Sequence, residues 1–443
     1  MLPPYLAYAG WSLALAPGTW LGDLVARGPA WLPVTSTRAM SVVGLALWSW
    51  PIAAWILASK LRVLDQATLD AARLTGAGPW RRNLMVLGMV QGAVAAAVGS
   101  VALVMMNSAV PLHLAQVPTL AIDVWTDLSL GASAGQAWLR AWPIVAAGAI
   151  GAVVLTRRLA GAPDLPARSD EPTPPRRWAW AGWAAAIGMS VLAPLTLYGL
   201  NLRETASLGR FWVLSGSAVR ESLVVASMTG VLVAGVALVV WCGLTCRPER
   251  SGGVRIVMAA CTVLLLLGAL SPGVLVGAAV RAWWNQAWLG EVGDWMNRSP
   301  LLLVLGHGAR FACVGAAAGW LLAGREPSHL RDLRRLHGAQ RVSDWWKLSV
   351  MAQPGVVVGV GLIGAALSAH EIEATVILAP VGSRPLAQQV LEHLHYNYVE
   401  EMGAAAVNLL VVTAAAAWLA GVLVWPRRPL NRPRASDESV HSA

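Results

Sequence analysis

Ionisable side chains inside strongly apolar segments are the residues of this chain whose types and spacing point to chemistry. Arg310 lies well inside the apolar run 300–323, with His307 one helical turn before it, and Glu371 and Glu373 follow another apolar run. Charge is costly inside a membrane, so such side chains face a bundle interior or a water-filled cavity. We take the arginine and both glutamates as candidates for a translocation path. The alternatives are a buried structural pair for the arginine and histidine, and a solvated loop for the acids.

No pattern for covalent catalysis or ATP hydrolysis accompanies these residues. A P-loop needs GxxxxGK[ST], and neither of the two lysines, Lys60 and Lys347, follows a glycine. His370-Glu371 lacks the second histidine of a zinc-binding HExxH motif, and the four cysteines have no CxxC spacing. His393 and His395 leave a metal site open as an alternative. We predict no catalytic site, no metal site and no cofactor in this chain. If the protein works with ATP, then ATP and Mg²⁺ would be bound by a separate ATPase.

The elements that must position these residues are membrane-spanning helices. The chain has 443 residues, of which 56% are hydrophobic and only 13% charged, unlike a soluble domain. A helix needs about 20 residues to cross a bilayer core. The clearest runs of this length are 84–106, 178–200, 218–243, 254–280, 300–323 and 402–425. Shorter or Gly/Pro-interrupted candidates are 3–20, 39–60, 137–156 and 348–369. We predict an all-α polytopic membrane protein with about ten transmembrane helices.

A polar, arginine-bearing segment occurs twice between these runs. The copies are Asp70-Ala71-Ala72-Arg73-Leu74-Thr75-Gly76 and Asp332-Leu333-Arg334-Arg335-Leu336-His337-Gly338. In each, an acid precedes the glycine by six residues, and a methionine follows the glycine by thirteen. Small residues permit close helix approach, and a glycine ends a helix at a turn. The duplication therefore indicates two matched docking helices for a two-fold partner. The alternative is a pair of ordinary basic loops.

The formal charge of +10 follows the topology. If both repeated segments face the cytoplasm and the helices alternate, 23 Lys and Arg lie inside, 9 lie outside, and Arg310 lies within a span. This is the positive-inside bias that orients membrane proteins. The basic excess is therefore no evidence for nucleic-acid binding. We predict a multi-pass protein with both termini cytoplasmic.

A Pro-rich polar stretch divides the chain into two unequal halves. The predicted units are a first half at 1–160 with about four spans and a repeated segment in 65–89, a linker at 161–177, a second half at 178–425 with six spans and a repeated segment in 327–351, and a polar tail at 426–443. Parallel repeats place similar bundles about a pseudo-axis, with a pathway at their interface. The first half has no counterpart of the two spans that open the second.

The repeated segment resembles the EAA loop of ABC importer permeases, on which the ATPase subunits dock. Asp70-Ala71-Ala72 and Gly76 fit the pattern, and Asp332 and Gly338 fit it in the second copy. There, Leu333-Arg334 replaces the two alanines. By this resemblance, these residues of both copies form the ATPase-coupling contacts.

Flanking stretches resemble the fused permeases of the iron(III)/thiamine/phosphonate importer group. His370–Pro380 is similar to that group's ELGAT-LLAPPG run, and Pro3-Pro4-Tyr5 is similar to its PPY segment. Asn107–Pro111 is similar to its DFGVP run, with Asn107 at the acidic position, which adds this asparagine to the path candidates. The resemblance implies two ATP-binding cassette subunits and a periplasmic or lipid-anchored solute-binding protein as partners, at the cell inner membrane.

Together these patterns predict the transmembrane permease subunit of an ATP-driven, binding-protein-dependent importer for iron(III) or a similar small solute. One alternative is an ion-coupled secondary transporter, in which Arg310, Glu371 and His307 would form a relay. Another is a degenerate permease with an assembly or sensing role, because the first half is short and the second repeated segment is altered.

Overall fold

The computed structural model describes residues 3–61, 74, 76, 78–160, 177–202, 204, 206–246, 251–326, 341–396 and 398–424. This part of the chain is helical and contains no strand. Eight of its helices are long and apolar enough to cross a membrane, or nine if one bent pair counts as a single span. The chain is therefore an all-α polytopic membrane protein, as its composition predicted. The predicted linker 161–177 and tail 426–443 lie outside the described residues, except that Arg177 begins a helix.

The first half contributes three of the long helices. Its helices are α1 (Pro4–Ser12), α2 (Trp20–Ala26), α3 (Trp31–Leu61), α5 (Pro79–Met106), α6 (Ala109–Leu114), α7 (Leu120–Ser129) and α8 (Ala134–Ala160). The run 3–20, expected as a fourth span, is not one helix. Helix α1 ends at Ser12, Gly18 follows at φ +86°, and α2 begins at Trp20 after the N-cap Thr19, whose hydroxyl accepts the amide of Gly22 at 3.0 Å. The turn and the N-cap divide this apolar run into two short helices.

The second half contributes the remaining long helices. All helices of this half are α9 (Arg177–Ile187), α10 (Ala193–Leu200), α11 (Ala206–Thr245), α12 (Ser251–Ala269), α13 (Gly273–Trp284), α14 (Gly290–Arg298), α15 (Leu301–Arg325), α17 (Val342–Trp345), α18 (Pro354–Ala369), α19 (Glu373–Leu378), α20 (Leu386–His395) and α21 (Val399–Val424). A π-helical turn joins α9 to α10, and another follows α17. The expected span 254–280 is divided between α12 and α13, because Pro272 cannot continue the first helix.

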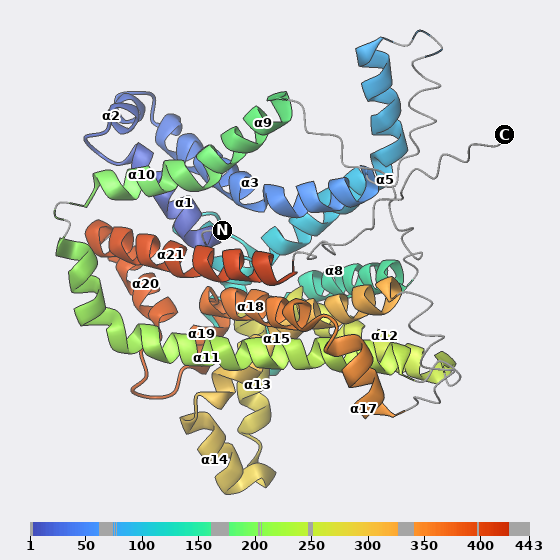
Figure 1. Ribbon diagram of the computed structural model, residues 1–443. Helices are drawn as coiled ribbons and strands as arrows, with labels where there is room; N and C mark the ends of the chain where they lie inside the picture. The colour runs from blue at the N-terminus through green and yellow to red at the C-terminus, as the bar shows by residue number, and fades with distance from the viewer. Residues whose placement is uncertain are drawn as a thin grey trace.

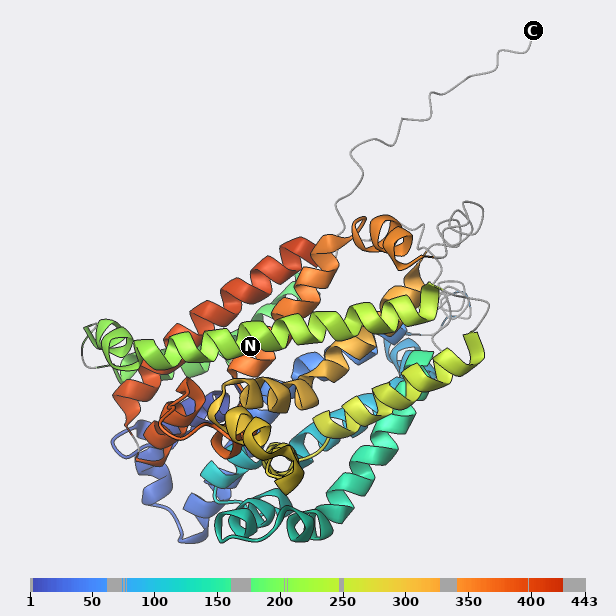
Figure 2. The same ribbon diagram turned by 90° about the horizontal axis from the view of Figure 1, so that it is seen from below.

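Helix α11 forms the spine of the second half, lying beside α15 and α18 in both views (Figures 1 and 2). Its close approach to α15 depends on Gly315, where an added side-chain carbon would collide with the backbone of Val233. The halves pack against each other at several places. Helix α12 packs on α8 of the first half, and α10 packs on both α1 and α21.

The same helix order occurs in both halves. In the first it is α3, α5, α6, α7 and α8, and in the second it is α15, α17 with α18, α19, α20 and α21. The equivalents differ in shape, because α5 is one helix of 28 residues whereas α17 and α18 meet at 87°. The bend precedes Pro354, which has no amide hydrogen and disfavours helical geometry at Gln353.

Candidate functional site

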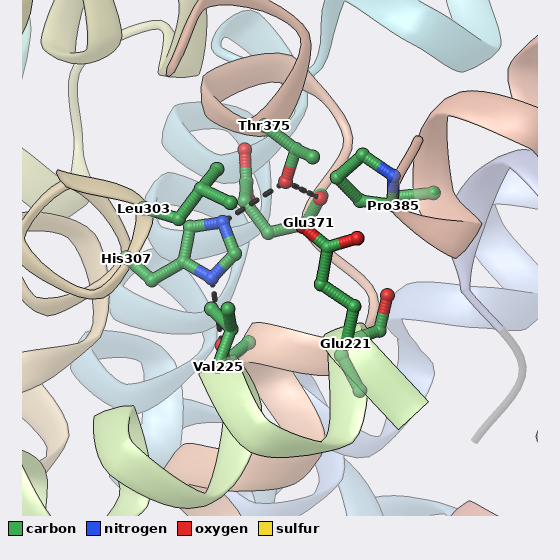
Figure 3. A pocket seen from close by; sticks show the side chains of 11 residues that line it. Glu221, Val225, Leu303, His307, Glu371, Thr375 and Pro385 are labelled. Carbon is green, nitrogen blue, oxygen red and sulfur yellow. Dashed lines mark hydrogen bonds between the residues drawn. The ribbon is translucent and has the colours of Figure 1, made fainter. Parts of the chain in front are cut away.

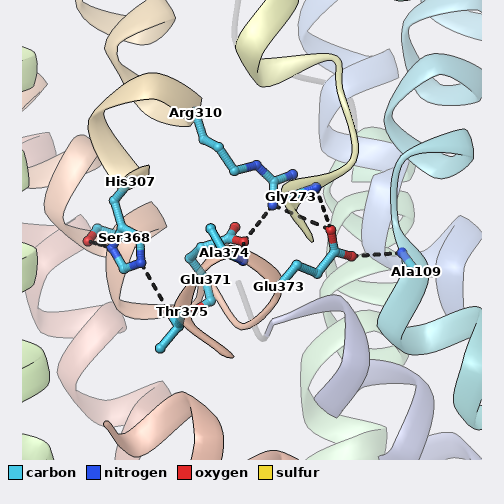
Figure 4. A network of polar contacts seen from close by, with 9 residues as sticks. All are labelled: Ala109, Gly273, His307, Arg310, Ser368, Glu371, Glu373, Ala374 and Thr375. Atoms are coloured by element: carbon cyan, nitrogen blue, oxygen red, sulfur yellow. Dashed lines mark hydrogen bonds and ion pairs between the residues drawn. The ribbon is translucent and has the colours of Figure 1, made fainter. Parts of the chain in front are cut away.

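A buried charged cluster forms where the two halves meet, with Glu373 at its centre (Figure 4). One carboxylate oxygen accepts the amide of Ala109 at 2.7 Å, and the other accepts the amide of Gly273 at 2.9 Å. Ala109 begins α6 of the first half, Gly273 begins α13, and Glu373 itself begins α19. The first amides of a helix lack intrahelical partners and favour negative charge. One buried carboxylate therefore ties a first-half helix to two second-half helices.

Arg310, in the middle of α15, neutralises this carboxylate and a second one. Its Nη1 lies 2.5 Å from Oε1 of Glu371 and 3.6 Å from Oε2 of Glu373. The arginine side chain is 13% exposed, and the two acids are less exposed still. A side chain at Gly273 would collide with both Arg310 and Glu373, so the glycine leaves room for the ion pair. The structure thus places three sequence candidates in direct contact.

Both glutamates reach the arginine because they lie at a break between helices. Helix α18 ends at Ala369 and α19 begins at Glu373, so Glu371 is not in a helix. Had both been helical, residues two apart would point about 200° away from each other. Glu371 also accepts the amide of Ala374 at 2.9 Å, which fixes its carboxylate beside the arginine.

His307, which sequence analysis paired with Arg310, makes different contacts. Its Nδ1 lies 2.7 Å from the hydroxyl of Ser368, and its Nε2 lies 2.9 Å from the hydroxyl of Thr375. The threonine hydroxyl in turn donates to the backbone oxygen of Glu371 at 2.5 Å. The histidine is 3% exposed and ties α15 to α18 and α19. Sequence reasoning missed the serine and threonine, since isolated hydroxyl residues in apolar helices carry no motif.

Asn107 lies at the edge of the cluster and does not join the ion pairs. It follows α5, two residues before Ala109, and its side-chain nitrogen donates to the backbone oxygen of Leu103 at 2.6 Å. Within the described residues, its Oδ1 and the Nε of Arg310 are buried without a hydrogen-bond partner. Buried polar atoms of this kind normally bind water or another ligand.

A narrow pocket of about 10 Å³, room for about one water molecule, reaches the histidine side of the cluster. Figure 3 shows His307, Glu371 and Thr375 on its wall, opposite Glu221 of α11. The glutamate of α11 accepts a hydrogen bond from the hydroxyl of Ser383. Polar side chains of α11, α15, α18 and α19 line the pocket, with apolar residues between them.

The arrangement can hold helices together through charge, but it can hold only a little solvent as it stands. Burying ions costs desolvation energy that is recovered only by good geometry and further hydrogen bonds. The pair of Arg310 and Glu371 and the two amides bound by Glu373 supply that geometry. Any motion that separates α6 from α19 must break the bond between Glu373 and the amide of Ala109. Among the described residues, no group of three or more His, Cys, Asp or Glu is placed to hold a metal ion.

Gly76 is the one candidate coupling residue that lies in the described part of the chain. Asp70, Ala71, Ala72, Asp332, Leu333, Arg334 and Gly338 lie outside the described residues. Gly76 is described and has φ +75°, a left-handed conformation that side chains other than glycine rarely adopt. Gly76 lies between α3 and α5, so its left-handed conformation makes a turn just before α5 begins.

No protein-family model matches this chain, and no curated protein or solved structure matches it significantly.

Proposed function

We propose that this chain is the transmembrane permease subunit of an ATP-driven, binding-protein-dependent importer. The observation that carries the proposal is the internal repeat. The same order of helices recurs in both halves, and each half inserts one arginine-bearing segment at the same place, between α3 and α5 and between α15 and α17. Two matched segments suit two identical ATPase subunits, and the resemblance of Asp70-Ala71-Ala72 and Gly76 to an EAA loop supports this assignment.

In this proposal the two segments face the cytoplasm of the inner membrane, where separate subunits bind Mg-ATP. A solute-binding protein delivers iron(III) or a similar small solute to the opposite face. The solute class rests on the resemblance of His370–Pro380 and Asn107–Pro111 to the iron(III)/thiamine/phosphonate group. Closure of the ATPases would move the halves, and the bond of Glu373 to Ala109, which joins them, would open and re-form in each cycle.

The test is reconstitution of the chain in lipid nanodiscs with a candidate ATPase and binding protein. The expected result is ATP hydrolysis that rises when loaded binding protein is added. Gly76→Ala should weaken this stimulation, because it forces a side chain into a left-handed turn. Gly78→Ala is the matched control, since Gly78 has φ −60° and open space around it. The proposal fails if no ATPase associates, or if the binding protein never stimulates hydrolysis.

A second candidate function is ion-coupled secondary transport. The side-chain contacts of His307 with Thr375 and of Arg310 with Glu371 support it, because ionisable residues within a membrane occur in proton relays; the threonine hydroxyl bonds the backbone oxygen of Glu371 and not its carboxylate. Uptake into vesicles that contain the chain alone distinguishes the two. Uptake driven by a proton gradient, with no ATPase present, would favour the transporter, and uptake that requires ATP and a second subunit would exclude it.

A further inference from the structure

A charged cavity lies at the end of the bundle away from α17, where α11 and α21 begin beside α20 (Figure 1). Its volume is about 260 Å³, which suits an amino acid or a molecule of similar size rather than a drug-sized ligand. The first turns of α11 and α21 and one side of α20 form its wall. No residue of the cluster around Arg310 lines it, so the cavity is a second, separate place where a ligand fits.

One cation on the wall is already neutralised within the protein. Arg210 of α11 lies 3.1 Å from a carboxylate oxygen of Glu204 and 3.5 Å from one of Glu400 in α21. The same oxygen of Glu400 accepts the hydroxyl of Ser207. These contacts hold the starts of α11 and α21 together. They also account for the charges of Arg210 and Glu400, so neither needs a ligand.

Three other charged side chains line the cavity without a counter-charge. They are Arg384, which precedes α20, Glu392 within α20, and Glu401 in the first turn of α21. Within the part of the chain that the structure describes, none of the three makes an ion pair or a side-chain hydrogen bond. One positive and two negative groups are therefore left over, and the cavity carries an excess of one negative charge.

The cavity also has an apolar surface beside an unused hydroxyl group. Phe211 and Ser215 of α11 line it and are only 7% and 5% exposed. The hydroxyl of Ser207, two turns earlier, is hydrogen-bonded to a backbone oxygen and to a carboxylate. That of Ser215 has no hydrogen-bond partner among the described residues. Because buried polar groups are normally hydrogen-bonded, this serine points to a polar ligand or water in the cavity.

We infer that this cavity binds a small organic molecule with one carboxylate and two amino groups, the chemistry of a dibasic amino acid. Arg384 pairs with the carboxylate, because guanidinium and carboxylate match in geometry. Glu392 and Glu401 pair with the two ammonium groups, and Phe211 contacts the alkyl chain. Such a molecule has one positive charge overall, which balances the excess in the cavity. The inference goes beyond the proposed transport function and does not rest on it, since all these residues belong to this chain.

Isothermal titration calorimetry of the full chain in phosphatidylcholine nanodiscs tests the assignment, with L-lysine as the probe. Two analogues each lack one of its charges, norleucine the side-chain amino group and cadaverine the carboxylate. We expect lysine to bind about tenfold more tightly than either analogue, because each lost charge leaves a charged side chain of the cavity unpaired. The absence of lysine binding, or equal binding of all three compounds, would overturn the inference.

Substitutions in the cavity show whether these side chains recognise the probe. Arg384→Gln should remove the preference for lysine over cadaverine, and Glu392→Gln combined with Glu401→Gln should remove the preference over norleucine. Arg298→Gln and Glu291→Gln are the matched controls, at exposed positions of α14 outside the cavity, and should keep both preferences. If the cavity variants keep both preferences as well, lysine binds elsewhere and the inference fails.

A lipid headgroup is the other possible source of paired charges at this end of the bundle. Phosphatidylethanolamine carries a phosphate and an ammonium group, so the titration is repeated in nanodiscs that contain this lipid. We expect the affinity for lysine to stay the same. A loss of about tenfold or more would overturn the inference, because the headgroup would then be the occupant of the cavity.

Discussion

The two halves repeat one order of helices but differ in polarity and in packing at equivalent positions. In the register set by the repeat, Arg310 and His307 of α15 correspond to Trp48 and Leu45 of α3. The most apolar stretch of α15 is 50% buried, whereas that of α3 is 22% buried. The second half therefore builds the charged cluster and encloses it, while the first half supplies an apolar counterpart and the amide of Ala109. The repeat preserves architecture, and chemistry is confined to one copy.

The largest expected effect is on the charged cluster itself. Arg310→Leu should lower the free energy of unfolding by about 3–5 kcal/mol, because two buried carboxylates lose their counter-charge. Chemical unfolding in detergent micelles measures it. Arg310→Leu with Glu371→Leu should recover part of the loss, since one of the two uncompensated carboxylates is removed while Glu373 keeps its two amide donors. Unchanged stability in the single variant would show that the cluster does not hold the second half together.

Replacing a glycine by alanine should change the free energy of unfolding in opposite directions in the two halves. Gly315→Ala should cost about 1–3 kcal/mol, because the methyl group meets the backbone of Val233 in α11. Gly99→Ala, on the open face of α5, should stabilise the isolated chain by about 0.5–1 kcal/mol through helix propensity. The same unfolding experiment compares them. A cost for Gly99→Ala equal to that of Gly315→Ala would remove the difference in packing between the halves.

A smaller effect is expected where the halves interlock. The hydroxyl of Tyr198 in α10 donates to the backbone oxygen of Leu6 in α1 at 2.9 Å, and both residues are fully buried. Tyr198→Phe should cost about 1 kcal/mol, because the carbonyl oxygen loses its partner while packing is kept. Thr196→Val, on the exposed side of the same helix, is the control. Equal effects of the two substitutions would argue against a specific contact between the halves.

The smallest effect concerns pH, and it too distinguishes the halves. Burial, helped by the nearby His395, lowers the pKa of His113 in α6 below its usual 6.5, whereas the register set by the repeat places Thr375 at the matching position of the second half. Protonation therefore favours the unfolded chain. The stability linked to neutral His113 is complete above about pH 6.5 and declines as pH falls through the lowered pKa. The melting temperature of His113→Gln should accordingly fall less than that of the parent between pH 7.5 and 5.5, as thermal unfolding would show.

Sequence reasoning recovered the architecture more fully than the site. Apolar length and the proline-rich stretch predicted most long helices, because crossing a bilayer imposes a length that composition reveals. The bend before Pro354 and the division of 3–20 at Gly18 were missed, since both depend on local backbone geometry. Charge in an apolar run identified Arg310. The amides of Ala109 and Gly273 could not be found in this way, because every residue except proline has one and only the fold brings these two to Glu373.

The composition of the native complex tests the central claim most directly. If the two repeated segments are coupling helices, native mass spectrometry of the protein purified from its own membrane should find two identical ATP-binding subunits bound to one chain. A chain isolated under the same mild conditions without any ATP-binding subunit would contradict the assignment as an importer permease. A single such subunit would contradict the claim that both halves couple.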